Sequence, residues 1–582
     1  MRKLLFVACA LLTIGFGAAA NQDMNSQFNK YKDKLVQDMW RMYPGWASSI
    51  GYHNYDSLLP VPDAAARANE IRFCKSQLIE LKKYPLASLN SANKTDYYLI
   101  ENQMKYSIWS IEQLKSYEWD PSTYNVCGSF ADMLGNDYAP LEQRLKSFGE
   151  RMDKVPAYYS AAKKNVKNPT LEHTKLAIDQ NMGGISVFRD DLNNALQKSK
   201  LTTGEKAKLL ARATDCIAAI NSYVSWLKNT PNVSQRSFRL GAELYKRKFE
   251  FEIQSGYTAL EIFHKAEAHK AELHSKMFAI TKQLWPKYFK GMAMPANELA
   301  AINEMIGVLS QKHVKPEEFQ EAIEKQLPFL VNFIKQKDLL YIDPSKPLVV
   351  RREPDYMAGV AGASINAPGP YDKNGNTYYN VGSLDGWDKE KAESYLREYN
   401  HYILQILNIH EAIPGHYTQL VYANQSPSII KSILGNNAMI EGWAVYTERM
   451  MLENGYDGDL GSDAKEASPE MWLMYYKWNL RSTCNTILDY KVHTMQMSRE
   501  DAMKLLVTEA FQQKAEAEGK WKRVSVSQVQ LCCYFTGYSE IYALREEMKN
   551  KLKEKFNLKK FHEQFLSYGS APVKYIRQAM LE

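Results

Sequence analysis

Residues 401–424 read HYILQILNIHEAIPGHYTQLVYAN, an apolar helical pattern that is interrupted at Pro414 and Gly415. The interruption separates His410 from His416, six positions later. On a regular helix six residues turn the chain by about 600°, which leaves the two side chains about 120° apart. Proline disrupts a helix interior and glycine relaxes it, so the stretch predicts two helices with a distortion between them. Only such a distortion can turn both histidines to one side.

A second segment, which begins 25 residues after His416, supplies carboxylates. It reads EGWAVYTE from Glu441 to Glu448, and seven residues, about 700° of helix, place both glutamates on one face. Two imidazoles and one carboxylate fill three positions of a tetrahedral zinc ion and leave the fourth for water. Either glutamate can be the ligand. We expect Glu441, with Glu448 as a supporting acid, and Glu411 beside His410 as the general base.

The segments HEAIPGHY and IEGWAVYTE resemble a bacterial family called domain of unknown function 885. Members of that family look like zincin metallopeptidases with a glutamate ligand. Weaker similarity runs through most of the mature chain and includes Gly241 to Tyr245, Asn366 to Asn380 and the tail from Gly569 to Pro572.

The resemblance implies zinc as the cofactor, with His410, His416 and Glu441 as ligands and Glu411 as base. It also implies that His493 lies near the metal and that a C-terminal tyrosine donates to the developing oxyanion. The C-terminal motif departs from the family pattern, which is close to an Arg-Tyr pair, then Pro-Gly-Gln and a later Tyr. Here the chain has Leu531-Cys532, then Thr536-Gly537-Tyr538, then Tyr542. Tyr538 and Tyr542 therefore both stay candidates, and His493 is either catalytic or a packed histidine.

Hydrophobic periodicity predicts a mainly α-helical chain. From about Met24 to Leu339 the pattern is long, polar-rich and 3.6-periodic, for example over residues 141–155, 209–227 and 259–284. Short β-like runs follow at residues 348–350 and 360–366. Asn374-Gly375, between residues 363–366 and 377–381, predicts a hairpin. The helical pattern resumes at Lys389.

We therefore expect a zincin-like metallopeptidase fold with a long helical body and a small β-sheet next to the active-site helix. The expected organisation is a signal peptide over residues 1–20, a helical body lining the cleft over residues 21–340, and a zinc-binding catalytic region over residues 341–582. The last two are expected to be interwoven as one unit.

The predicted hairpin offers a place for a substrate. Zincins commonly bind an extended peptide along a strand edge through main-chain hydrogen bonds. That edge is either residues 363–366 or residues 378–381, so Ser364, Asn366 and Tyr379 are candidate substrate-binding residues. An equally weighted alternative is that the hairpin only caps the helices.

The N-terminus has the order of a secretory signal peptide. Basic Arg2 and Lys3 precede an apolar stretch over residues 4–16, and small residues up to Ala20 offer an A-x-A cleavage site. We expect cleavage after Ala20 and export to the periplasm or beyond. The alternatives are a lipid anchor at Cys9 and a retained N-terminal anchor.

Composition excludes several classes of protein. With 45% hydrophobic and 24% charged residues, the chain is not disordered, collagenous or coiled-coil. The net charge of +7 falls to +5 when Arg2 and Lys3 are removed, and no basic run points to nucleic acid. No later apolar run reaches the roughly 18 residues that a membrane span needs. The six cysteines of the mature chain form no CxxC, so neither a disulfide scaffold nor a thiolate zinc site is expected.

The sequence thus predicts an exported zinc-dependent peptidase with a peptide substrate, and it leaves the oligomeric state open. One alternative is a zinc amidase acting on cell-wall or small-molecule amides. Another is a non-catalytic helical periplasmic binding or scaffold protein, which the six-residue histidine spacing and the altered C-terminal motif favour. A chance His-Glu followed closely by His is expected in roughly one chain of this size in twenty.

Overall fold

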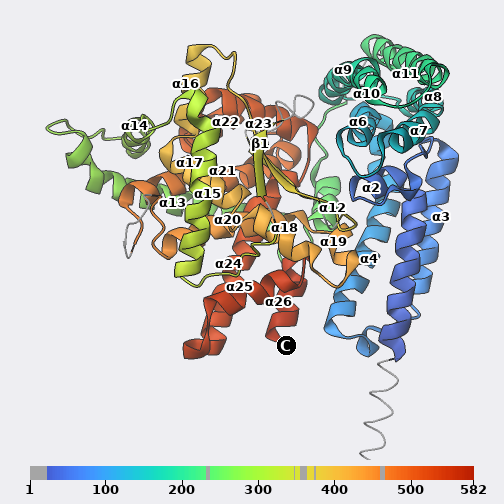
Figure 1. Ribbon diagram of the computed structural model, residues 1–582. Helices are drawn as coiled ribbons and strands as arrows, with labels where there is room; N and C mark the ends of the chain where they lie inside the picture. Colours follow the sequence, from blue (N-terminus) through green and yellow to red (C-terminus); the bar gives the residue numbers. More distant parts are fainter. Residues whose placement is uncertain (1–22, 231–235, 347, 354–362, 373–374, 459–465) are drawn as a thin grey trace, which may run out of the picture. The chain divides into compact units, whose positions relative to one another are not determined.

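The computed structural model describes residues 23–230, 236–346, 348–353, 363–372, 375–458 and 466–582 (Figure 1). The expected signal peptide and Asn374 of the expected turn lie outside these ranges. Contacts divide the chain into two compact units. One comprises Met1–Phe238 and Gly369–Lys373, and the other comprises Arg239–Pro368 and Asn374–Glu582. The division by contacts falls at residue 238, whereas the sequence analysis placed its boundary near residue 340.

Helices build the first unit. Residues 23–42 are helical, and the later α-helices are α2 (Pro44–Ser49), α3 (Ala64–Leu81), α4 (Ser91–Trp109), α5 (Ser116–Trp119), α6 (Cys127–Gly135), α7 (Leu141–Met152), α8 (Val155–Asn165), α9 (Leu171–Ser186), α10 (Leu192–Lys198) and α11 (Thr203–Asn229). Short 3₁₀ turns lie at His53–Tyr55, Leu86–Ser88 and Pro121–Thr123, and π-helical turns lie at Ser110–Leu114 and Val187–Asp191.

The core of this unit follows from helical spacing. In α7 the side chains of Leu145, Phe148 and Met152 recur three and four residues apart, and all three are buried. The Phe148 ring meets Phe130 of α6 edge to face, with ring centroids 4.7 Å apart. The amphipathic pattern read over residues 141–155 therefore corresponds to a real buried face.

The second unit contains helices α12 to α26 and the sheet. Its α-helices are α12 (Ala242–Glu252), α13 (Ala259–Tyr288), α14 (Glu298–Leu309), α15 (Phe319–Gln336), α16 (Lys389–Glu398), α17 (His401–Glu411), α18 (His416–Asn424), α19 (Ile429–Ile433), α20 (Asn437–Glu453), α21 (Pro469–Thr494), α22 (Arg499–Met503), α23 (Lys514–Val526), α24 (Cys533–Leu552), α25 (Leu558–Ser567) and α26 (Val573–Leu581). Among its described residues, 3₁₀ turns lie at Pro316–Glu318, Gln530–Cys532 and Lys553–Lys555, and a π-helical turn lies at Lys504–Glu509.

Two glycines let α20 and α24 touch backbone to backbone. A Cβ atom on Gly442 would lie 2.3 Å from the carbonyl carbon of Gly537, and one on Gly537 would lie 1.6 Å from the carbonyl oxygen of Ala438. Any larger side chain at either position would push the helices apart. Because Glu441 directly precedes Gly442, this close contact helps to set where that carboxylate lies.

A three-stranded sheet completes the second unit (yellow in Figure 1). Its strands β1 (Leu348–Arg352), β2 (Ala363–Asn366) and β3 (Thr377–Val381) lie in the order β1-β3-β2. β2 pairs antiparallel with β3, as predicted, and β1 pairs parallel with β3. Residues 367–376 separate β2 from β3, so the connection is longer than the expected tight Asn-Gly turn. The expectation of a mainly helical fold with a small sheet is confirmed.

None of the helices in the described part of the chain is both long and apolar enough to cross a membrane. The six cysteines among the described residues are all buried free thiols.

Candidate metal centre and its cavity

The helix that carries His410 is broken where the sequence required a break. α17 ends at Glu411, residues 412–415 leave the helical path, and α18 begins at His416. The Gly415 amide donates to the carbonyl oxygen of Ile409 at 2.9 Å. A Cβ atom on Gly415 would lie 1.9 Å from the His410 carbonyl oxygen, so this close return of the chain needs glycine.

The break brings His410 and His416 together with Glu441 of α20. One nitrogen of each ring and one carboxylate oxygen lie within 4.8 Å of one another. Glu441 Oε2 is 3.3 Å from His416 Nε2 and 3.8 Å from His410 Nε2. A tetrahedral metal about 2.0–2.1 Å from each ligand holds the ligand atoms roughly 3.3 Å apart. In these three residues, which we call the ligand cluster, two of the spacings are 3.3 and 3.8 Å and none exceeds 4.8 Å, so the ligand atoms would have to draw together by at most about 1.5 Å to hold such an ion.

Glu448 lies behind the ligand cluster, where the sequence analysis placed a supporting acid. Its Oε1 atom is 2.7 Å from His410 Nδ1 and accepts a hydrogen bond from Trp478 Nε1 at 3.0 Å. When Glu448 is ionised this oxygen can only accept, so His410 Nδ1 carries the proton and Nε2 keeps its lone pair. Of the two glutamates that the sequence left open, Glu441 faces the histidine nitrogens and Glu448 orients one imidazole.

Burial and mutual charge tune the protonation of the cluster. Burial and the neighbouring His416 lower the pKa of His410 to about 4, so this ring is neutral at neutral pH. Burial alone would also lower the pKa of His416, but the hydrogen bond and charge of Glu441 raise it. The same hydrogen bond outweighs burial for Glu441 and lowers its pKa. Glu441 is thus a carboxylate, the form that binds a metal.

Glu411, the expected general base, lies next to His410 in the chain. It ends α17 directly after His410, and both residues line one cavity. Burial raises the pKa of its carboxyl above the usual range, while the charges of His416 and His410 oppose the shift. A carboxylate with a raised pKa accepts a proton more readily than an exposed one.

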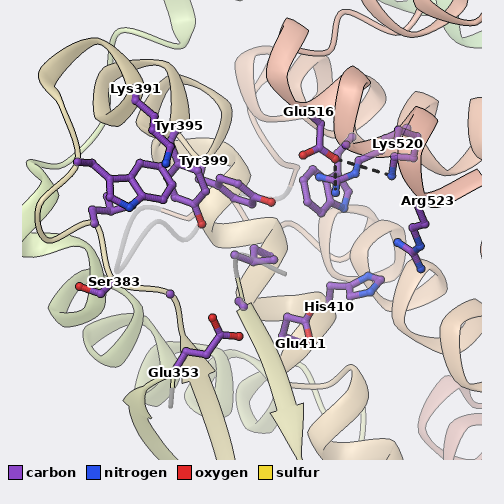
Figure 2. A pocket seen from close by; sticks show the side chains of 18 of the residues that line it. Glu353, Ser383, Lys391, Tyr395, Tyr399, His410, Glu411, Glu516, Lys520 and Arg523 are labelled. Atoms are coloured by element: carbon purple, nitrogen blue, oxygen red, sulfur yellow. Dashed lines mark ion pairs between the residues drawn. The ribbon is translucent and has the colours of Figure 1, made fainter. Parts of the chain in front are cut away.

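The cavity has a volume of about 1170 Å³ and lies wholly within the second unit. Helices α16, α17, α21, α23 and α24 and the strands β1 and β2 contribute to its walls. In Figure 2, Lys391, Tyr395 and Tyr399 stand on one side, and Glu516, Lys520 and Arg523 stand on the other. A cavity of this size accommodates several residues of an extended peptide or a ligand of similar bulk.

Tyr534, which the sequence analysis missed, is the C-terminal tyrosine that lines this cavity, beside Tyr395 and Tyr399. Tyr534 lines the cavity on α24, its hydroxyl accepts a hydrogen bond from Arg523 at 3.1 Å, and burial and the Glu441 charge raise its pKa to about 12. No motif in the sequence marks Tyr534 as a residue of the site. Only the packing of α24 against α20 brings it to the site.

Tyr538 and Tyr542, the predicted donors, are held elsewhere. The Tyr538 hydroxyl accepts a hydrogen bond from Arg449 at 2.8 Å. The Tyr542 hydroxyl is 3.4 Å from Glu453 Oε1, and its ring stacks under Arg449 at 4.1 Å. Neither tyrosine is among the residues that line the cavity. Their predicted catalytic role is therefore not supported by their positions.

His493 is a packed histidine. It is fully buried near the end of α21, where its Nε2 atom lies 3.0 Å from the carbonyl oxygen of Val524 and 3.2 Å from that of Ser527. Its ring stacks against Tyr245 with centroids 5.9 Å apart. It does not line the cavity, so it fastens α21 to the end of α23 instead of serving the ligand cluster.

The three predicted substrate-binding residues lie in different surroundings. β2 is an edge strand whose first residue, Ala363, lines the cavity, and Ser364 in it accepts a hydrogen bond from Asn380 Nδ2 at 3.4 Å. Asn366 is exposed at the end of that strand. Tyr379 instead is fully buried in β3 and donates to Asn408 Oδ1 of α17 at 2.8 Å. This side chain braces the helix that carries His410, and β3 lies between β1 and β2, so Tyr379 does not lie on a free strand edge.

Known proteins match this chain over nearly its whole length. A family model described as "Bacterial protein of unknown function (DUF885)" matches residues 44–580. A solved structure described as "a putative lipoprotein of unknown function from Shewanella oneidensis" is 53% identical, covers 95% of this chain and 100% of its own, and has a TM-score of 0.85. A second, described as "the putative lipoprotein from Colwellia psychrerythraea", is 16% identical, covers 96% and 98%, and has a TM-score of 0.74, which shows a shared fold alone. None of the curated proteins compared with the chain matches it.

Proposed function

The chain belongs to the DUF885 family of bacterial proteins, and from that premise and the geometry of its ligand cluster we propose that it is an exported zinc-dependent peptidase with a zincin-like active site. The observation that carries the proposal is the meeting of His410, His416 and Glu441 across a broken helix. Histidine and carboxylate donors at this spacing suit zinc. The carboxylate of Glu448 behind His410 is the support that metal-binding histidines commonly have.

His410, His416 and Glu441 would hold the ion. Zinc in such a site lowers the pKa of a bound water toward about 7 and polarises a carbonyl oxygen. Glu411 accepts a proton from the water that attacks the peptide carbonyl carbon. It then delivers that proton to the leaving amine nitrogen as the C–N bond breaks. The products are one carboxylate and one amine.

Tyr534 is the donor that the cavity offers to the carbonyl oxygen as it gains negative charge. Its hydroxyl keeps its proton at neutral pH, because burial raises its pKa to about 12. Arg523 donates to the same hydroxyl and so orients its proton away from the guanidinium. One such donor is typically worth a factor of about 10² to 10³ in rate.

The first test is metal content per chain by elemental analysis. We expect about one zinc per wild-type chain, the same in Glu411→Gln, and a loss in both His410→Ala and His416→Ala. Glu411→Gln should abolish peptide hydrolysis. A wild-type chain that takes up no zinc after reconstitution would refute the proposal, and hydrolysis retained by Glu411→Gln would remove Glu411 as base.

Export is the second part of the proposal. The Shewanella oneidensis relative is described as a lipoprotein, and this chain carries both a signal-peptide pattern and Cys9. Mass spectrometry of the mature protein distinguishes the two forms of export, since cleavage after Ala20 leaves Asn21 at the N-terminus and lipidation leaves a modified Cys9. An intact Met1 would contradict export.

A further inference from the structure

Four cationic side chains line one wall of the cavity. Arg481 comes from α21, and Lys520, Lys522 and Arg523 come from α23, which packs against α21. We call these four residues the cationic wall. The only acid that these two helices contribute to the lining, within the described residues, is Glu516. The wall therefore carries four basic side chains against one acidic side chain in the cavity that His410 and Glu411 also line.

Lys520 is the member of this wall that is buried without a carboxylate at hydrogen-bond distance. Its side chain is only 4% exposed, yet its nearest carboxylate oxygen, Glu516 Oε1, is 3.8 Å away, beyond hydrogen-bond length. The same oxygen, Glu516 Oε1, already pairs with Arg481 Nη2 at 2.7 Å. Burial and the Arg481 charge lower the pKa of Lys520 to about 7. An anion that enters the cavity beside Lys520 would favour its charged form, which burial otherwise disfavours.

Arg481 points to the same conclusion by a separate observation. Its Nη1 atom is buried and has no hydrogen-bond partner among the described residues, although its Nη2 atom pairs with Glu516. The guanidinium lies over the Trp478 ring at 4.8 Å, which holds it in place. Arg481 also interacts with the Tyr399 hydroxyl. Two cationic side chains from neighbouring helices thus line one cavity. This is the arrangement that binds a carboxylate.

We propose that Arg481 and Lys520 form a subsite for a carboxylate of the substrate, so that the cavity selects peptides with a free carboxylate close to the bond that is cut. The inference rests on the proposed function for its substrate class, because the anionic group of a peptide is a carboxylate. That carboxylate is either the C-terminus or the side chain of Asp or Glu. His410 and Glu411 line the same cavity, which places the subsite within reach of the reacting groups.

Binding tests the subsite without relying on turnover. The mature full-length Glu411→Gln protein is titrated in a calorimeter with an N-acetylated dipeptide of neutral residues as its free acid and as its C-terminal amide. We expect the free acid to bind at least about tenfold more tightly. Lys520→Met in that background should abolish the preference, and Lys520→Arg should keep part of it. Lys514→Met, the same substitution at an exposed position of α23 outside the cavity, should leave it unchanged.

A second arm identifies the source of the carboxylate. Amidated dipeptides that end in Glu or Gln are titrated beside the neutral pair. A preference for the free acid supports the C-terminus, and a preference for amidated Glu over amidated Gln supports a side chain. Equal binding within both pairs, or a preference that survives Lys520→Met in a folded variant, overturns the subsite. If the wild-type protein cleaves no peptide while the Lys520-dependent preference persists, the peptidase proposal fails and the carboxylate subsite stands.

Discussion

Glu448 supports His410 from the side opposite the ligand cluster: its Oε1 atom lies 2.7 Å from His410 Nδ1, whereas Glu441 Oε2 lies 3.8 Å from Nε2 of the same ring. The two glutamates come from one face of α20, seven residues apart, as the sequence predicted. They nevertheless address opposite edges of one imidazole. One carboxylate is therefore free to bind a metal, and the other fixes the tautomer and the tilt of the ring.

The first prediction concerns this support. Glu448→Gln replaces the carboxyl group that faces His410 Nδ1 with an amide, which is a weaker acceptor, and it should weaken zinc affinity by about 10- to 100-fold without unfolding the chain. Competition with a chelator of known affinity measures the change. Glu453→Gln, on the same helix but paired with Arg449 and Arg545, is the matched control and should bind zinc as the wild type does. An unchanged affinity in Glu448→Gln would show that His410 needs no such support.

A second prediction concerns the break between α17 and α18. Gly415→Ala places a methyl group 1.9 Å from the His410 carbonyl oxygen, so the chain must move or strain. We expect a loss of about 1–3 kcal/mol in the free energy of unfolding and a marked loss of bound zinc. Chemical denaturation and elemental analysis give the two quantities.

Gly307→Ala serves as the control for this change. Gly307 lies inside α14, where an added Cβ meets no atom within 4 Å, and alanine favours a helix interior over glycine. This variant should be as stable as the wild type or slightly more so, with its zinc intact. If Gly415→Ala behaved in the same way, the close return at His410 would not be what holds the two histidines together.

The helix break and the ligand cluster could be read from the sequence because local covalent rules determine them. Pro414 lacks an amide proton, Gly415 admits a close backbone approach, and seven-residue spacing puts Glu441 and Glu448 on one face. Each of these constraints acts within a single segment. Only the meeting of the two segments depends on tertiary packing.

Residues that depend on packing alone were missed. Tyr534 and Tyr538 are four residues apart on α24 and share a face, so the sequence cannot say which one meets the cavity. Arg523 of α23 binds the first and Arg449 of α20 binds the second, and both arginines come from other helices. Lys520 was missed because a lysine in a polar helical pattern reads as solvent-exposed, and only the structure shows it buried.

The tyrosines give a third prediction, which separates the two assignments. Tyr534→Phe should lower kcat by about 10²- to 10³-fold with little change in KM and with zinc retained, because the lost donor acts on charge that develops in the transition state. Tyr538→Phe and Tyr542→Phe remove hydroxyls that bind Arg449 and Glu453, and kcat should stay close to that of the wild type. Steady-state kinetics on a peptide that the wild type cleaves compares all three. The reverse pattern, with kcat lost in Tyr538→Phe alone, would restore the sequence-based assignment.

The last prediction concerns pH and stability away from the metal. His562 of α25 is fully buried, its Nδ1 donates to the Leu339 carbonyl oxygen at 2.8 Å, and its Nε2 accepts from the Tyr446 hydroxyl at 2.8 Å. Burial lowers its pKa to about 4, whereas an unfolded histidine titrates near 6.5.

Because the unfolded chain binds this proton more tightly, stability is fully present above about pH 6.5 and is lost as the pH falls toward 4. At pH 4 the loss from this one residue is about 3 kcal/mol. His562→Gln cannot titrate, so its free energy of unfolding should fall less between pH 7 and pH 4.5 than that of the wild type, even though it starts lower. His264→Gln, at an exposed histidine of α13, should show the wild-type slope. Parallel pH profiles for wild type and His562→Gln in denaturant titrations would mean that His562 does not carry the acid sensitivity.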